Sequence, residues 1–293
     1  MLWLYLVLAA QFLNALVILW DKYLVTSSAK PVVYAFYVSI LSGIVVVLLP
    51  FGVISLPNPL TLWLPIAVGL AYLLSILFLY QALQMADASD VTPVTGAAAS
   101  ISSFILGAYF LGEHLTKDFS IAFVLLILGM GLMSYFRFTA KTFTYSLLAG
   151  VFFGVSLILT KVVFAHYSLV DGFFWTRIAN VFGGLLLLAW PANRKSILHG
   201  IKSSTSGTKY AIIINKVLAG VAFFLILLSI RIGNVSLVNA MVGIQFVFVL
   251  LFALAFSDKF KNYLYEDVKD KNVILQKILG IKFIIVGLAF LFL

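Results

Sequence analysis

Apolar stretches long enough to cross a lipid bilayer recur along the whole chain, with short polar segments between them. Crossing the hydrocarbon takes about 20 apolar residues, because each backbone polar group must find its hydrogen-bond partner within the helix. A chain that is 63% hydrophobic and only 10% charged cannot form a polar surface, which excludes a water-soluble domain. The sequence predicts an all-α membrane protein with ten transmembrane helices. They cover approximately residues 2–20, 32–49, 62–82, 91–111, 119–136, 145–164, 172–190, 210–230, 235–256 and 273–293.

Two parts of the chain repeat similar residues in the same order. Residues 86–96 align with residues 233–243 at an offset of 147, which matches Ser89 with Ser236 and Gly96 with Gly243. Because further matches drift in offset only between predicted helices, we expect two related units of five helices each, residues 1–140 and 141–293. An odd number of helices places the second unit upside down, and such inverted repeats surround the substrate site of alternating-access transporters. The further matches are Lys22 with Lys161, Gly43 with Gly184, Pro50 with Pro191 and Gly129 with Gly287.

A series of motifs runs through the third to fifth predicted helices. They are Tyr80-Gln81-Ala82-Leu83, Ala86, Ala88-Ser89, Val91, Pro93, Leu111-Gly112-Glu113, Leu115-Thr116 and Leu128-Gly129. This pattern resembles the EamA family of the drug/metabolite transporter superfamily, and residues 233–240 with Ile244-Gln245 are similar in the second half. Ser257-Asp258-Lys259 stands where the first half has Leu-Gly-Glu. The resemblance implies a secondary transporter fold with a central cavity lined by both halves, and it implies no particular substrate.

Apart from Lys277, which lies at the start of the last predicted helix and is counted with the preceding loop, four basic residues fall within the predicted helices: Arg177, Lys161, Lys216 and Lys282. A lone charge at the bilayer centre costs about 3 kcal/mol or more, so such residues indicate functional positions. The acidic residues, Asp21 among them, fall at predicted helix ends or in loops, and this disfavours a proton-exchanging exporter of cations. Buried positive charge instead suits an anionic or zwitterionic solute. Lys161 and Lys216 could instead reach the headgroups, while Lys282 could face a dimer contact, the cavity or the interface.

Polar side chains at helical spacing form the candidate substrate site. Arg177, Asn180 and Gly184 share one face, as do Thr92, Thr95, Ala99 and Ser102, although a stripe of small residues suits helix packing equally well. Asn239 aligns with Thr92 in the repeat. Tyr34 aligns with Trp175, and aromatic residues near helix starts also occur as interfacial belts. The full set of substrate-binding candidates is Arg177, Asn180, Trp175, Tyr34, Thr92, Thr95, Asn239 and Lys161.

Three residues at helix ends are candidates for gate or hinge positions. Tyr80 and Gln84 share a face at the end of the third predicted helix, and Gln84 aligns with Arg231 in the second half. A simple solvated helix end would carry the same residues. The equivalence in the repeat favours matching gates on the two sides of the membrane.

Enzyme chemistry finds little support in the sequence. Asp87 and Asp90 form a D-x-x-D pair without a second acidic pair, and His114, His166 and His199 lack the spacing of metal ligands. There is no glycine-rich loop that would hold a nucleotide phosphate. We therefore expect neither an enzyme nor a bound cofactor or metal.

The charge distribution bears on orientation and partners. Thirteen Lys and Arg residues fall in odd-numbered predicted loops and two in even-numbered ones, which places both termini outside the cell by the positive-inside rule. The family resemblance implies both termini inside. The net charge of +9 suits contact with anionic lipid rather than nucleic acid. A homodimer through the fifth and tenth helices would use Gly129, Gly131 and Gly287.

These observations predict a multi-pass secondary transporter of the prokaryotic cell membrane that moves a small polar, anionic or zwitterionic metabolite by alternating access. A lipid-linked carrier or flippase is the alternative, and a membrane-embedded enzyme or scaffold is a weaker one.

Overall fold

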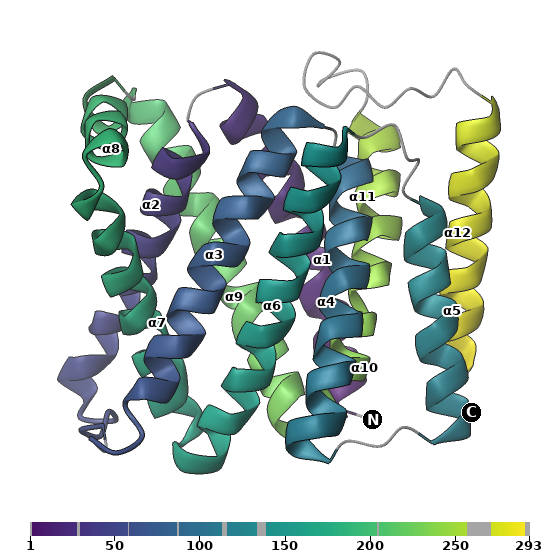
Figure 1. The fold of residues 1–293 in the computed structure, drawn as a ribbon, viewed down its shortest axis with the longest axis horizontal. Coiled ribbons are helices and arrows are strands. Elements are labelled where there is room, and N and C mark those ends of the chain that lie inside the picture. Colours follow the sequence, from purple (N-terminus) through teal and green to yellow (C-terminus); the bar gives the residue numbers. More distant parts are fainter. Residues whose placement is uncertain are drawn as a thin grey trace.

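A computed structural model describes residues 2–27, 30–57, 59–86, 88–112, 116–133, 139–203, 205–256 and 271–290. These residues form helices and connecting segments, with no strand among them. Figure 1 shows most of the helices running side by side as one bundle. The elements in chain order are α1 (Leu2–Ser27), α2 (Pro31–Leu41), η1 (Ser42–Phe51), α3 (Trp63–Met85), α4 (Ala88–Leu111), α5 (Lys117–Met133), α6 (Ala140–His166), α7 (Leu169–Leu186), η2 (Leu187–Ala189), α8 (Pro191–Ser203), α9 (Ser206–Ile232), α10 (Val235–Ala240), α11 (Val242–Phe256) and α12 (Lys271–Phe290).

The predicted apolar segments all overlap helices of the described chain, which confirms the all-α expectation. Among the described residues, seven helices are long and apolar enough to cross a membrane: 2–26, 31–51, 63–85, 90–111, 140–166, 169–189 and 206–232. Shorter apolar helices cover residues 237–249 and 278–287. The chain is thus an integral, multi-pass membrane protein, while the count of ten spans and the inverted repeat stay predictions.

Polar side chains begin several of these helices. Thr139, Ser168, Thr205 and Asn234 each accept a hydrogen bond from a backbone N–H three residues on, at the starts of α6, α7, α9 and α10. The first N–H groups of a helix have no partner within it, and a side-chain oxygen supplies one. Short polar connections therefore separate long apolar helices without leaving these donors unpaired.

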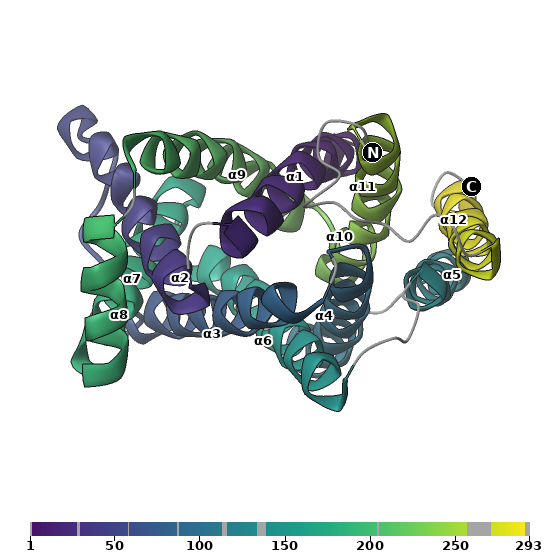
Figure 2. The same ribbon diagram turned by 90° about the horizontal axis from the view of Figure 1, so that it is seen from above.

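Helix α8 lies in a polar segment between two predicted membrane helices, where the sequence predicts a loop. It runs across the direction of the other helices, seen end-on in Figure 1 and from the side in Figure 2. Its Ile197 is buried against Val33 and Phe36 of α2, while Arg194 and Lys195 are exposed. An apolar face on the bundle and a basic face away from it are the pattern of a helix at a membrane surface.

Close helix packing depends on glycine at several contacts, including those of Gly154 and Gly129. A Cβ atom added to Gly154 of α6 would overlap Ser102 Oγ and lie 2.7 Å from Ala99 O on α4. One added to Gly129 of α5 would lie 2.6 Å from Ile284 of α12. Helices α5 and α12 stand together at one end of the molecule (Figure 2). Gly129 and Gly287 thus serve packing within the chain, whereas Gly131 faces open space, and the homodimer stays a prediction.

Candidate functional site

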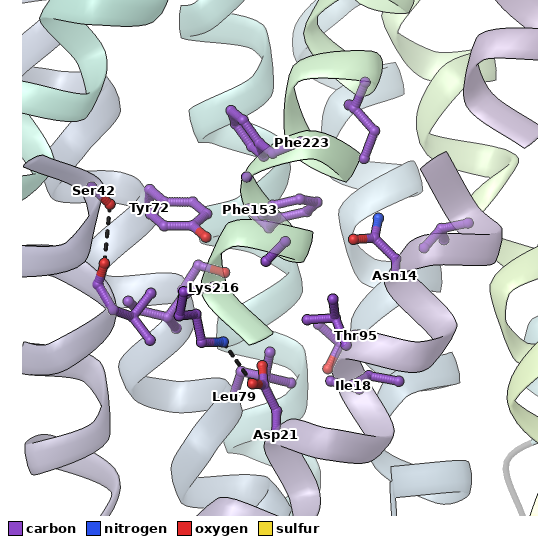
Figure 3. A pocket seen from close by; sticks show the side chains of 18 of the residues that line it. Asn14, Ile18, Asp21, Ser42, Tyr72, Leu79, Thr95, Phe153, Lys216 and Phe223 are labelled. Carbon is purple, nitrogen blue, oxygen red and sulfur yellow. Dashed lines mark hydrogen bonds and ion pairs between the residues drawn. The ribbon is translucent and has the colours of Figure 1, made fainter. Parts of the chain in front are cut away.

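A cavity of about 230 Å³ lies inside the bundle, between α1, α3, α4, α7 and α9, with further residues from α2, η1, α6, α10 and α11. Its wall combines apolar and aromatic side chains with a small number of polar groups, as small-molecule sites usually do. Figure 3 shows several of these side chains converging from separate helices. The polar and aromatic lining residues are Asn14, Asp21, Ser42, Tyr72, Ser75, Tyr80, Thr92, Thr95, Phe153, Phe173, Arg177, Lys216, Phe223, Asn239, Gln245 and Phe246.

Arg177 lies in the middle of α7 and lines this cavity. Its guanidinium carbon is 4.0 Å from the ring centre of Phe223, 5.2 Å from that of Tyr72 and 5.8 Å from that of Phe173. Its Nε is buried and has no hydrogen-bond partner within the part of the chain that the structure describes. The salt bridges of the described residues do not include Arg177. Aromatic faces attract this cation without neutralising it, so it can receive an anion.

A second charged group in the cavity is the pair formed by Asp21 and Lys216. Lys216 Nζ on α9 lies 2.6 Å from Asp21 Oδ1 on α1, and the side chains are 9% and 6% exposed, respectively. Figure 3 shows Lys216 reaching toward Asp21, away from the rings of Tyr72, Phe153 and Phe223. The pair thus places one negative and one positive charge on the same wall of the cavity.

Asp21 accepts hydrogen bonds unevenly on its two oxygens. Oδ1 accepts from Tyr34 Oη at 2.5 Å and Asn215 Nδ2 at 2.6 Å, in addition to Lys216. Oδ2 accepts only from Tyr80 Oη, at 3.4 Å, among the described residues. One carboxylate oxygen is therefore saturated with donors, and the other is open.

The structure corrects two expectations from the sequence. Asp21 is not at a helix end but inside α1, only 4% exposed, because α1 continues to Ser27 beyond the predicted end. Lys216 does not extend to the headgroups, because its ammonium pairs with Asp21. Contrary to the prediction, a carboxylate is therefore buried within a membrane-spanning helix.

Four of the predicted substrate-binding residues line the cavity: Arg177, Thr92, Thr95 and Asn239. The hydroxyls of Thr92 and Thr95 donate to carbonyls of their own helix, Ala88 O and Val91 O. Their oxygens still have lone pairs with which to accept from a solute. The polar stripe of α4 thus faces the cavity at Thr92 and Thr95, and farther along it packs on α6 at Ser102.

The other four predicted substrate-binding residues lie outside the cavity lining. Tyr34 is fully buried behind Asp21, to which it donates. Asn180 bonds Ser42 and Ser39 and joins α7 to α2, while Trp175 donates to Ser55 O. Lys161 donates to the carbonyls of Ile230 and Gly233 at the end of α9. These contacts indicate structural roles.

The candidate gate residues are divided in the same way. Tyr80 lines the cavity beside Asp21, whereas Gln84 and Arg231 are exposed and lie outside its lining. The motif residue Glu113, the segment Ser257-Asp258-Lys259, Asp87 and His114 lie outside the described residues.

Several cavity residues were missed by sequence reasoning, namely Asp21, Asn14, Tyr72, Gln245 and the aromatic residues. Asn239 and Gln245 lie on either side of Met241, between α10 and α11, and both line the cavity. The described residues contain no group of three or more acidic, His or Cys side chains that could hold a metal ion.

Comparison with known proteins agrees with this architecture. Residues 1–135 match the family model described as the EamA-like transporter family, which confirms the resemblance drawn from the motifs. A solved structure titled only "Crystal structure of protein" matches with a TM-score of 0.65 and 16% identity, covering 96% of this chain and 97% of that chain. At this identity the match shows the fold alone. No curated protein matches the chain.

Proposed function

We propose that this chain, an EamA-like transporter of small molecules, carries a small anionic metabolite and binds the anionic group of that solute at Arg177. The observation that carries the proposal is the position of Arg177, which lines the cavity and whose buried Nε has no hydrogen-bond partner among the described residues. A solute carboxylate, sulfonate or phosphate would supply a charge-assisted hydrogen bond to this group.

The charge balance of the cavity supports an anion over a cation. Among the lining residues, Arg177 and Lys216 are basic and Asp21 is acidic, so one positive charge is in excess. Asp21 is already neutralised by Lys216 at 2.6 Å. A cationic solute would meet the uncompensated charge of Arg177, whereas an anionic solute cancels it.

The aromatic rings around Arg177 indicate that the rest of the solute is apolar. Tyr72, Phe153, Phe173 and Phe223 line the same cavity as the guanidinium. Apolar groups gain about 25 cal/mol for each Å² removed from water. An anion with an apolar or aromatic body therefore suits the site better than a fully hydrated one such as inorganic phosphate.

Alternating access by two inverted units, residues 1–140 and 141–293, is part of the proposal. It is supported by equivalent contacts in the two units. Lys22 donates to carbonyls at the end of α3, and Lys161 does the same at the end of α9. Ser39 and Asn180, which are 141 positions apart as the repeat expects of matched residues, contact each other between α2 and α7. A contact between equivalent residues of two units is typical of residues near a twofold axis.

The test compares three probes of nearly equal shape and different charge: benzenesulfonate, benzenesulfonamide and phenyltrimethylammonium. A ligand that binds the native protein raises its melting temperature. We expect benzenesulfonate to do so more than the neutral probe, and the cation to have no effect. The screen then extends to anionic, zwitterionic and cationic metabolites, and saturable counterflow of the best anion is measured in proteoliposomes. Stabilisation by cations alone would contradict the proposal.

A further inference from the structure

We propose that Asp21 and Lys216 couple the transport of the anion to a proton: the anion takes Lys216 from Asp21, and Asp21 then takes up a proton. This inference rests on the proposed function, since it needs an anion in the cavity. It adds the coupling ion and the residue that carries it.

The geometry of the pair carries the argument. Lys216 Nζ lies 2.6 Å from Asp21 Oδ1, and Lys216 also lines the cavity proposed to hold the solute. Lys216 has three N–H donors, and its hydrogen bonds among the described residues go to Asp21 and, at 3.5 Å, to Tyr80. An anion that contacts Lys216 therefore competes with Asp21 for the same cation.

When the anion takes Lys216, the Asp21 carboxylate loses the cation that neutralises it. This carboxylate is buried, and an unpaired charge in such a place costs several kcal/mol. Asp21 lines the cavity, and its Oδ2 accepts one long hydrogen bond among the described residues, from Tyr80 Oη at 3.4 Å. A proton from the aqueous side can bond to this oxygen, which converts the carboxylate into a neutral carboxyl group and leaves Lys216 as an ammonium.

The titratable and charged groups around Asp21 come from several helices. Lys216 from α9, Tyr34 from α2 and Tyr80 from α3 face Asp21, and Asn215 adds a neutral donor. On α1 itself, Lys22 instead contacts the end of α3. The helices α10 and α11 contain no titratable residue in their described parts, and α4 contributes Asp90 in its first turn.

Charge balance gives the coupling a physical basis. The empty cavity carries one excess positive charge, from Arg177 and the neutral pair of Asp21 with Lys216. A cavity that holds a monoanion and a proton carries the same excess charge. The empty and loaded protein would therefore change conformation with the same charge in the membrane, whereas an anion alone would alter it.

The experiment uses benzenesulfonate and methanesulfonate, which are permanent anions and bring no proton of their own. Calorimetric titration of the full chain in detergent at pH 7, in buffers of different ionisation enthalpy, gives the number of protons taken up per anion bound. We expect uptake approaching roughly one proton, and an anion affinity that falls by up to about tenfold per pH unit as the pH rises. The affinity falls with rising pH because each anion binds together with a proton, and protons become scarcer as the pH rises.

Two variants assign the proton. Asp21→Asn should bind the anion through Arg177 with no proton uptake and no pH dependence. Should that variant fold poorly, the double variant Asp21→Asn with Lys216→Gln removes both charges together and should also take up no proton. The matched control is Asp171→Asn, because Asp171 is a buried carboxylate outside the cavity lining that bonds Ser55 and Ser168. It should leave proton uptake unchanged.

The outcomes separate the two proposals. If neither sulfonate binds, the anion site and the coupling are both wrong. If a sulfonate binds the wild-type protein without proton uptake, the coupling is wrong and the anion site stands. If proton uptake persists in the Asp21 variants, the assignment to Asp21 is overturned.

Discussion

Lys22 and Lys161 make the same contact at the ends of two different helices. Lys22 Nζ lies 3.0 Å from Leu83 O and 2.9 Å from Ala86 O, where α3 ends. Lys161 Nζ contacts Ile230 O and lies 2.9 Å from Gly233 O, where α9 ends. The last carbonyls of a helix lack partners within it and carry partial negative charge, so a cation stabilises them.

Removal of either lysine should destabilise the protein to a similar extent. We expect Lys22→Met and Lys161→Met each to lower the free energy of unfolding by about 1–3 kcal/mol, the usual range for hydrogen bonds to a charged group or for carbonyls left without one. Thermal unfolding in detergent measures the loss. Lys209→Met is the control, since Lys209 is exposed in the first turn of α9. A stable variant at either position would show that the two contacts are not equivalent.

Arg177→Gln should weaken anion binding with little effect on folding. A hydrogen bond to a charged group contributes about 1.5–3 kcal/mol, which corresponds to roughly a tenfold to hundredfold loss of affinity. Titration with benzenesulfonate measures this change. The control is Arg231→Gln, because Arg231 is exposed and lies outside the cavity lining. Equal affinity in the wild-type protein and the Arg177 variant would exclude Arg177 as the anion site.

The ion pair in the cavity should show strong coupling in a double-mutant cycle. Lys216→Met alone leaves Asp21 buried without its cation, and breaking a buried pair in this way costs about 3–5 kcal/mol. Asp21→Asn with Lys216→Met should cost less than the sum of the two single variants. Denaturant titration gives the four stabilities. Lys195→Met on the exposed face of α8 should be neutral. Additive effects would mean that the pair contributes nothing.

Gly154→Val should disrupt the contact between α4 and α6. The added Cβ atom would overlap Ser102 Oγ and meet the backbone at Ala99 O, which cannot move away. Overpacking of this kind typically costs about 1–3 kcal/mol. Gly131→Val is the matched control, because a Cβ atom there has no neighbour within 4 Å. Comparable melting temperatures of the two variants would contradict the proposed packing.

Sequence patterns predicted the helices well, and the site only in part. Arg177, Thr92, Thr95 and Asn239 line the cavity, as their helical spacing or repeat position suggested. Asn180 was placed on the same face as Arg177, but it bonds Ser42 at 2.8 Å. Three positions along a helix are enough to turn a side chain from the cavity to a neighbouring helix, and spacing alone does not distinguish these surroundings.

Asp21 shows most clearly why the remaining site residues were missed. Hydropathy ended the first helix before the charge at residue 21, whereas α1 continues to Ser27. The backbone hydrogen bonds of a helix do not depend on side-chain charge, and a charged residue can be accommodated where another charge meets it. That other charge belongs to Lys216 on α9, which is far from Asp21 in the sequence, so a hydropathy average over neighbouring residues does not include it.

Composition and apolar length by themselves determined that this chain is helical and lies in a membrane, because only helices satisfy their own backbone in hydrocarbon and each segment does so locally. Tertiary structure decided which charges are neutralised and which remain available to a solute. Asp21 and Lys216 lie 195 positions apart and cancel each other, while Arg177 is surrounded by aromatic rings. The physical reason is that neutralisation requires contact within a few ångströms, and only the folded bundle sets those distances.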